Sequence, residues 1–286
     1  MKYAFIATHE SHFSVKRMCR VLKVTRSGYY AWSSRTPSKR EQSNQVLLEL
    51  IKKVFQVSRR TYGSPIIYAY LRRHGCQCGH NRVARLMHLH GIMARRRHRR
   101  FPITTQRQPG VVPAPNLLKR DFAADRPNRK WVTDITYIDT AEGWLYLASV
   151  MDLFSRKVVG WAMSDKIDGT LATNALRMAW TTRRPICGLL HHSDQGRQFT
   201  GAPYQQVLAE MGCQVSMNRT GECYDNATME SFFATLKTEC ATGQFASRAE
   251  ARRTIFEYLE GWYNRKRLHS SLDYLSPAEY EALSGH

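Results

Sequence analysis

The chain has 286 residues, of which 43% are hydrophobic and 11% aromatic, a composition typical of a folded protein and not of a disordered one. No apolar run approaches the roughly 18 residues that span a bilayer, and the first residues lack a signal-peptide pattern, so we expect a soluble, intracellular protein. The net charge of +20 indicates a partner rich in phosphate, and seven scattered cysteines indicate reduced thiols rather than a disulfide framework.

The basic residues are concentrated in the first part of the chain. Residues 1–120 contain 25 Lys and Arg against three Glu, a net charge of +22, whereas the remainder carries −2. A merely solvated surface would mix both signs. This asymmetry predicts a phosphate-binding N-terminal part joined to a part with another task.

Residues 1–60 are predicted to form a helical region containing a helix-turn-helix. The first helix has apolar residues at helical spacing: Val15, Met18, Cys19 and Leu22. Thr25 can cap the second helix, whose aromatic residues are Tyr29, Tyr30 and Trp32. The apolar face of a longer helix, Leu47 to Val54, would serve equally well for dimerisation or for core packing.

Residues 61–94 are predicted to form a second helix-turn-helix-like module. Ser64 and Pro65 open its first helix, Gly75 ends it, and Asn81 caps the next helix before Gly91. We expect four of its side chains to contact DNA: Arg72, Arg73, Arg82 and Arg85. Small helical units of this kind also serve as packing or dimerisation domains.

A short run of possible metal ligands lies between these two helices. His74, Cys76, Cys78 and His80 have one residue between neighbours, whereas zinc loops have gaps of two to four residues. The spacing therefore favours a polar turn over a zinc site.

Residues 95–120 are predicted to be a basic linker, because prolines follow an arginine run and no periodicity is present. We expect five arginines of the linker to follow a DNA backbone; the less favoured alternative is that the segment is only a solvated tether. These arginines are Arg95, Arg96, Arg97, Arg99 and Arg100.

Residues 121–245 change to an alternation of strands and helices. Three β-rich runs cover Trp131 to Asp139, Trp144 to Met151 and Lys157 to Met163. Helices are predicted over Leu171 to Thr181, Tyr204 to Met211 and Ala227 to Glu239, and a buried strand over Ile186 to His191. The order β-β-β-α-β-α-β-α predicts a mixed five-stranded sheet flanked by helices, an α/β architecture of the ribonuclease-H-like type.

Residues 246–286 are predicted to form a C-terminal helix and a basic tail. Ser247 and Glu250 make a capping box, and the buried stripe consists of Ile255, Tyr258, Leu259 and Trp262. We expect three residues of the tail to contact DNA: Arg265, Lys266 and Arg267.

Three acidic residues stand out by their context. Asp134 lies in the middle of an apolar strand, where an ionised carboxylate needs a compensating cation or hydrogen bonds. Asp194 follows the predicted strand Ile186 to His191, and 35 residues separate Asp194 from Glu230. Glu230 lies on a predicted helix that also presents Lys237 on the same face. Three such carboxylates can hold a hard cation, and two ions can drive an in-line displacement at phosphorus.

The sequence around these acids resembles the DDE transposases of the insertion sequence three family and the cores of retroviral integrases, which share the final spacing. The resemblance is carried by WVTDITYI at 131–138, HSDQGRQF at 192–199 and DNATMESFFATLK at 225–237. It extends to YYAW at 29–32, YGSP at 62–65, RVARLM at 82–87, YNRKRLH at 263–269 and Ser276-Pro277, and so covers nearly the whole chain.

The resemblance implies that Asp134, Asp194 and Glu230 are catalytic metal ligands for two Mg²⁺ ions, with Mn²⁺ as a substitute, and that Lys237 contacts the DNA end. Asp152 and Arg156 match a further family pattern, which we interpret as structural because the pair lies at a turn between strands. Asn226 is expected to shape the loop before the catalytic helix, and Gly221 to let that loop rearrange around DNA.

We therefore predict an insertion-sequence transposase that cleaves DNA 3′ ends and transfers strands. The alternatives are a ribonuclease-H-like nuclease and a non-catalytic, transposase-derived DNA-binding regulator. The expected partners are double-stranded DNA at the element's terminal inverted repeats and at the target, a second copy of the chain, and an upstream-frame protein or fusion with a helix-turn-helix and a leucine zipper. Such a protein would act in the bacterial cytoplasm, on the nucleoid when bound to DNA, without a membrane partner.

Overall fold

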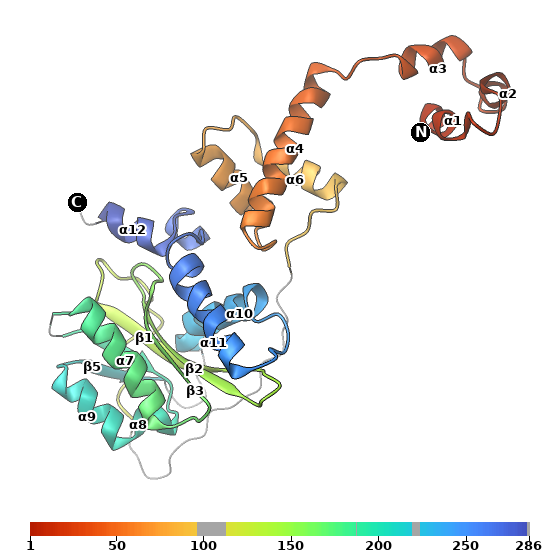
Figure 1. The fold of residues 1–286 in the computed structure, drawn as a ribbon. Coiled ribbons are helices and arrows are strands. Elements are labelled where there is room, and N and C mark those ends of the chain that lie inside the picture. The colour runs from red at the N-terminus through yellow and green to blue at the C-terminus, as the bar shows by residue number, and fades with distance from the viewer. Residues whose placement is uncertain (96–112, 187, 219–223, 285–286) are drawn as a thin grey trace. The chain divides into compact units, whose positions relative to one another are not determined.

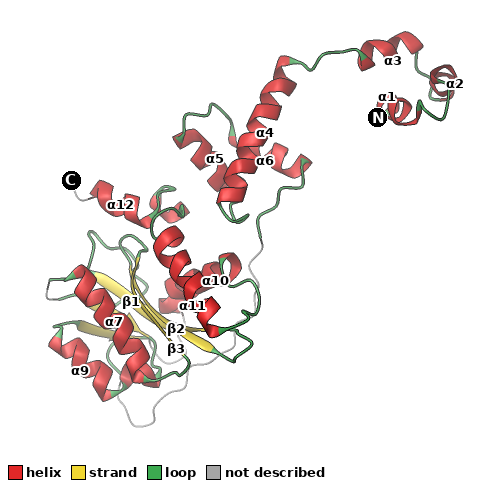
Figure 2. Ribbon diagram, viewed as in Figure 1, coloured by secondary structure: helices red, strands yellow, loops and turns green. Residues whose placement is uncertain are grey.

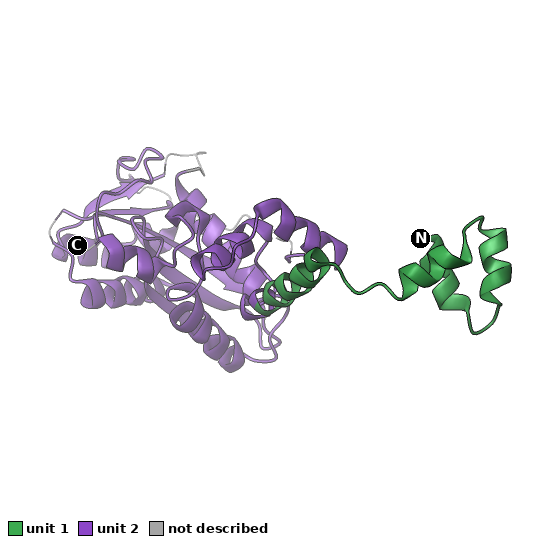
Figure 3. Ribbon diagram, turned by 90° about the horizontal axis from the view of Figure 1, so that it is seen from above, with its two compact units in different colours: residues 1–53 green, residues 54–286 purple. Residues whose placement is uncertain are grey.

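The computed structural model describes residues 1–95, 113–186, 188–218 and 224–284 (Figure 1). The chain divides into two compact units, residues 1–53 and residues 54–286, coloured separately in Figure 3. The division falls inside one helix, α4 (Lys39–Val57), and therefore precedes the boundary expected at residue 60.

The first unit contains three short helices around a small apolar cluster. They are α1 (Lys2–His9), α2 (Val15–Val21) and α3 (Arg26–Ser33). Ser14 caps α2, and the Thr25 hydroxyl accepts a hydrogen bond from the Gly28 backbone N–H at 3.1 Å, as the sequence predicts for the second helix. The cluster is formed by Ile6, Met18, Cys19 and Tyr29. The predicted helix-turn-helix is present.

The apolar face of α4 is buried within the single chain. Leu47 and Ile51 are 4% and 0% exposed, which favours core packing over the alternative of a free dimerisation surface. Two further helices follow, α5 (Ser64–Arg73) and α6 (His80–Leu89). Asn81 does not cap α6, because Gly79 occupies the N-cap position and no side-chain cap is formed. That part of the prediction was wrong by two residues.

The second unit is built on a mixed five-stranded sheet (Figure 2). Its strands are β1 (Lys130–Ile138), β2 (Leu145–Asp152), β3 (Val158–Ser164), β4 (Leu190–Ser193) and β5 (Gln214–Met217). Their order across the sheet is β3-β2-β1-β4-β5; the first three are antiparallel to their neighbours in sequence, and β4 pairs parallel with both β1 and β5. This topology confirms the predicted ribonuclease-H-like architecture.

Helices cover both faces of the sheet (Figure 1). One face packs against α7 (Gly169–Arg183), α8 (Arg197–Thr200) and α9 (Ala202–Glu210), which share an apolar cluster with the strands. Gly160 on β3 allows α7 to approach, since a Cβ there would collide with the Ala175 carbonyl oxygen. The other face receives α10 (Ala227–Glu239), whose bounds are those predicted. Helix α11 (Arg248–Phe256) reaches β3 through Arg252, which donates to the Met163 carbonyl oxygen at 2.6 Å.

Strand β4 begins later than the sequence suggests. Its predicted range starts at Ile186, but Ile186 is 82% exposed and Gly188 has a φ of +92°, so the chain turns before the strand starts at Leu190. Ile186, Gly188 and Leu189 therefore lie outside the strand.

The C-terminal region follows the prediction in its buried stripe. Ile255, Tyr258 and Leu259 have no exposed surface, and α11 continues as a π-helix over Glu257–Tyr263. The Ser247 hydroxyl accepts from the Glu250 N–H at 3.1 Å, while the Glu250 carboxylate accepts from the Ala246 N–H at 2.9 Å, one residue before the expected donor. A 3₁₀ turn (Ser270–Leu272) and α12 (Pro277–Ser284) end the described chain.

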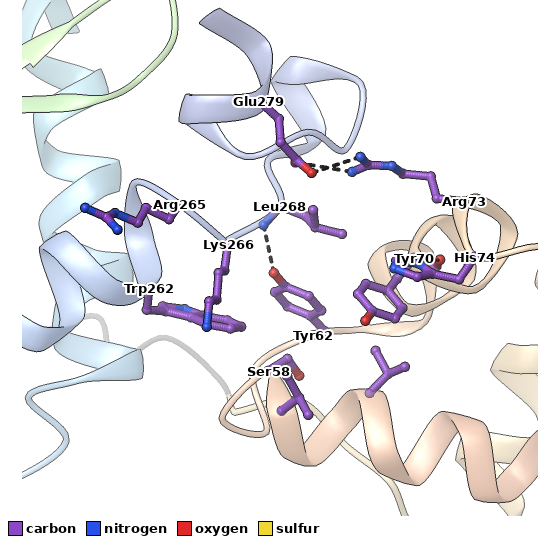
Figure 4. Close-up of a pocket in the computed structure, with 12 residues that line it drawn as sticks. Ser58, Tyr62, Tyr70, Arg73, His74, Trp262, Arg265, Lys266, Leu268 and Glu279 are labelled. Atoms are coloured by element: carbon purple, nitrogen blue, oxygen red, sulfur yellow. Dashed lines mark hydrogen bonds and ion pairs between the residues drawn. The ribbon is translucent and has the colours of Figure 1, made fainter. Parts of the chain in front are cut away.

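The α5 segment packs against this C-terminal region inside the second unit (Figure 4). The Tyr62 hydroxyl accepts from the Leu268 backbone N–H at 2.7 Å, and Arg73 forms an ion pair with Glu279 at 3.0 Å. A cavity of about 240 Å³ lies between them, bordered by Trp262. The segments expected as separate modules, 61–94, 121–245 and 246–286, thus belong to one compact unit.

None of the helices in the described ranges is both long enough and apolar enough to cross a membrane.

Candidate active site

Asp134 is placed by the alternation of side chains along β1. Trp131 and Ile135 belong to the apolar cluster that packs with α7, and residues of opposite parity face the other side of the sheet. Asp134 therefore points toward the face covered by α10. Its carboxylate is partly buried and accepts a hydrogen bond from the Ile135 backbone N–H at 2.7 Å.

Asp194 is placed by the parallel register between β1 and β4. Val132 lies opposite His192, so continuing the register by two residues brings Asp194 to the level of Asp134. The chain leaves the sheet there, and the Asp194 carboxylate accepts from the Gly196 N–H at 2.9 Å, which fixes the turn. Two acids 60 positions apart in sequence thus lie at the same level of the sheet, one in the middle of β1 and one just after the end of β4.

Helix α10 supplies the third acid and a cation. Glu230 is exposed in its first turn, and Lys237 lies two turns later on the same face, half-buried. Burial lowers the pKa of Lys237, while the charge of Asp134 opposes that effect. Lys237 is therefore close enough to Asp134 for their charges to interact.

The pKa of Asp134 is affected by the charges of the other two acids. Burial raises the pKa of Asp134 well above its ordinary value, and the charges of Asp194 and Glu230 raise it further. The hydrogen bonds from the Ile135 N–H and from the Asn226 side chain act in the opposite direction. An ionised Asp134 is thus unfavourable until a positive charge compensates it.

The donor chemistry of this group fits a divalent cation. Its three carboxylates are the oxygen ligands that hard cations prefer, and the Asn226 Oδ1 atom is a buried oxygen that accepts no hydrogen bond in the described part of the chain. Across the described ranges, no three His, Cys, Asp or Glu side chains are arranged so that they could already hold a metal ion together. The carboxylates therefore interact without forming a closed ligand set.

The run His74, Cys76, Cys78, His80 spans the connection between α5 and α6, and His80 is the first residue of α6. The His74 ring stacks on Tyr70 at 4.1 Å, and its Nδ1 hydrogen-bonds to the Tyr70 carbonyl at 2.8 Å. Burial and the neighbouring Cys76 raise the pKa of the Cys78 thiol.

Two supporting networks were not recognised in the sequence. His192 at the end of β4 is buried between the Ser216 hydroxyl (2.8 Å) and the Asn218 amide oxygen (2.6 Å). The buried Asp225 accepts from the Arg120 N–H and from the Asn116 amide, which ties the start of α10 to the last residues of the predicted linker. Both residues lie inside the quoted motifs, but their partners are about 24 and 105 residues away in sequence.

The side chains predicted to contact DNA differ in their solvent exposure. Exposed side chains are found at Arg72, Arg73, Arg85, Arg95, Arg265 and Lys266, whereas Arg82 is partly buried. Arg72 hydrogen-bonds to Gln77 at 2.7 Å, and Arg73 is engaged by Glu279. Four of the linker arginines lie outside the described residues, as does Gly221: Arg96, Arg97, Arg99 and Arg100.

Arg267 is held in an internal ion pair, an arrangement that speaks against the predicted DNA contact. Its guanidinium lies 2.9 Å from the Glu239 carboxylate, and the two side chains are only 14% and 4% exposed. Burial alone would lower the pKa of Arg267, but Glu239 raises it above its ordinary value. The pair joins the end of α10 to the C-terminal segment.

Asp152 is the last residue of β2 and Arg156 lies shortly before β3, so the pair flanks the turn between these strands, as expected. The buried Asp152 carboxylate accepts from the backbone N–H groups of Phe154 (3.0 Å) and Asn128 (2.7 Å), which agrees with a structural role. Arg156 instead reaches α10 and donates to the Thr228 hydroxyl at 3.0 Å.

Family models and a curated relative match most of the chain. Two models described as integrase core domain match residues 124–223 and 211–277, and a model described as an HTH-like domain matches residues 41–100. Transposase InsF for insertion sequence IS3A of Escherichia coli K12 is 44% identical over 285 residues, which cover 98% of each chain. The chain belongs to the IS3 family of transposases. This relation makes it a member of the polynucleotidyl transferase class of enzymes.

Other family relatives and solved structures extend the comparison. An IS600 protein of Shigella sonnei, described as an uncharacterized 31 kDa protein of that insertion element, is 42% identical and covers 92% of this chain and 97% of its own. A simian T-cell lymphotropic virus intasome structure aligns with a TM-score of 0.46 at 12% identity, covering 81% of this chain and 74% of that chain. The HTLV-2 integrase catalytic core in complex with magnesium aligns at 0.42 and 15%, covering 55% and 97%.

Proposed function

We propose that this member of the IS3 family cleaves DNA 3′ ends and joins them to new DNA, with Asp134, Asp194 and Glu230 as the catalytic metal ligands. The observation that carries the proposal is that the charges of Asp194 and Glu230 both act on Asp134. Residues from β1, from the turn after β4 and from α10 thereby interact at one place. Such convergence is uncommon for solvated surface acids.

Each side chain of the site has a distinct task in this proposal. When bound, two Mg²⁺ ions, or Mn²⁺ in their place, would activate the attacking oxygen and stabilise the leaving one. Asn226 orients the Asp134 carboxylate through its hydrogen bond. Lys237, within range of Asp134, contacts a phosphate of the DNA end.

The chemistry proceeds in two displacements and needs no covalent protein intermediate. Water first attacks the phosphodiester at the element's end, which frees a 3′-hydroxyl, and that hydroxyl then attacks a phosphodiester of the target. Both steps transfer a phosphoryl group from one oxygen to another, so the same carboxylates serve both.

The basic surface supplies the contacts to double-stranded DNA, at the terminal repeats and at the target. The described side chains proposed for this task are Arg72, Arg73, Arg82, Arg85, Arg95, Arg265 and Lys266. Pairing two ends calls for at least two copies of the chain. An upstream-frame protein or fusion with a helix-turn-helix and a zipper is proposed as a further partner.

The test is a joining assay with purified protein, Mg²⁺ and duplexes taken from both termini of the element that encodes the chain. Asp134→Asn, Asp194→Asn and Glu230→Gln should each lower joining by about 10³-fold or more. The exposed Asp165 lies outside the site, so Asp165→Asn is the matched control and should join normally. Normal joining by any of the three amide variants would refute the proposal; cleavage alone would indicate a nuclease, and binding alone a regulator.

A further inference from the structure

A second cavity of the molecule lies against α10 but away from the carboxylates. It measures about 500 Å³ and is bordered by Thr228 and Ser231 of α10, by Arg156, and by the segment from Arg267 to Ser271. Glu230 and Lys237 do not border it. The helix that carries the catalytic acid therefore also forms a wall of this cavity.

Arg156 gives the cavity an uncompensated positive charge. It lies at the turn between β2 and β3, is partly buried, and donates one hydrogen bond to the Thr228 hydroxyl. Within the described residues, no carboxylate forms an ion pair with it, although burial lowers its pKa and makes an anionic neighbour favourable. A partly buried guanidinium without an acid is costly unless a ligand supplies the negative charge.

The other two basic side chains that border the cavity, Arg267 and His269, add no uncompensated charge to that of Arg156. The charge of Arg267 is neutralised by Glu239 at 2.9 Å. Burial, aided by the positive charges of Arg267 and Arg156, lowers the pKa of His269 to about 3, so that its ring is neutral at pH 7. One guanidinium surrounded by hydroxyl groups and a neutral imidazole is a donor set suited to a phosphate group.

We propose that this cavity binds a phosphate group of a DNA strand, with Arg156 as the recognising cation and the Thr228 hydroxyl beside it. The assignment of the phosphate to DNA rests on the proposed function. A strand held there would be fixed to the helix that carries Glu230 and Lys237. Arg156 is thus a positioning residue for the substrate and takes no part in the chemistry.

The test measures DNA affinity as a function of salt, by fluorescence anisotropy in EDTA, so that no reaction takes place. Arg156→Gln should weaken binding about tenfold at low salt and reduce the slope of log affinity against log salt by about 0.9, the contribution of one phosphate contact in duplex DNA. Arg156→Lys, which keeps the charge, should retain the slope. Arg177→Gln removes an exposed arginine of α7 outside the cavity and should change neither quantity.

Two further measurements separate the possible outcomes. If Arg156→Gln fails to fold, Thr228→Val keeps the charge and should still weaken binding severalfold with an unchanged slope; unaltered affinity would overturn the proposal. Inorganic phosphate is the second probe: a rise in the melting temperature of the wild-type protein but not of Arg156→Gln, together with an unchanged DNA slope, assigns the cavity to small anions and overturns the DNA assignment. Because binding is measured without metal, a loss of slope in Arg156→Gln supports the cavity even where the joining assay fails.

Discussion

Arg267→Gln provides a sharp test of the ion pair that joins α10 to the C-terminal segment. The substitution leaves Glu239 with hydrogen bonds from Tyr258 (3.0 Å) and Trp262 (3.3 Å) but without its counter-charge. Breaking a buried pair by removing one partner costs about 3–5 kcal/mol. For a unit of this size, each kcal/mol corresponds to roughly 2–4 °C, so the melting temperature should fall by roughly 6–20 °C.

Thermal unfolding followed by circular dichroism measures this effect, and two variants calibrate it. The double variant Glu239→Gln with Arg267→Gln should be more stable than Arg267→Gln alone, because no unpaired charge remains. Asp125→Asn removes an exposed partner of Arg129 at 3.9 Å and should change stability by less than about 1 kcal/mol. A variant Arg267→Gln with unchanged melting temperature but a DNA salt slope reduced by about 0.9 would refute the internal role and restore the sequence-based prediction of a DNA contact.

Three further predictions concern stability, each measured by urea unfolding. Tyr62→Phe leaves the buried Leu268 N–H without its acceptor at 2.7 Å and should cost about 1–3 kcal/mol, whereas Tyr68→Phe should cost little; equal effects would contradict the assigned hydrogen bond. Gly160→Ala should cost about 1–3 kcal/mol because the new Cβ meets the Ala175 carbonyl, while Gly169→Ala, with open space around it, should be neutral or stabilising; a stable Gly160→Ala protein would argue against the close approach of α7. The pKa of His269 is lowered to about 3 in the folded protein, so on acidification this side chain is protonated in the unfolded chain before it is protonated in the folded one. The free energy of unfolding should therefore fall as the pH drops below about 6.5, by up to about 1.4 kcal/mol per pH unit. His269→Gln should make that decline shallower, whereas the control His90→Gln, at an exposed histidine, should leave it unchanged.

Local patterns predicted most of the elements because their physical causes are local. The α10 bounds, the Thr25 cap and the buried stripe of Ile255, Tyr258 and Leu259 follow from helical periodicity and capping chemistry. The errors also have local causes. The sequence indicates Asn81 as a cap because its side chain can accept a hydrogen bond, but the helix begins earlier, after Gly79. It indicates a strand at Ile186 because that residue is apolar, but Gly188 turns the chain before the strand starts.

Contacts between distant segments could not be predicted in the same way. The hydrogen bond between Tyr62 and Leu268 joins residues 206 positions apart, and neither residue carries a pattern that names its partner. The same holds for Arg267, whose basic neighbourhood in sequence indicated DNA while the fold gives it Glu239. For the candidate site, the resemblance supplied the three acids, and the parallel register of β1 with β4 explains why two of them meet.

Helix α10 has only 13 residues, yet three separate environments depend on its rotation about its own axis. Glu230 and Lys237 interact with the charge of Asp134. Thr228 and Ser231 border the cavity that contains Arg156, and Glu239 forms an ion pair with Arg267. A slip of one residue would turn the helix by about 100° and advance it by about 1.5 Å, so all three would lose their partners together. The ion pair between Glu239 and Arg267 at the C-terminal end of α10 therefore fixes the rotation of the whole helix, and with it the direction in which Glu230 and Lys237 point.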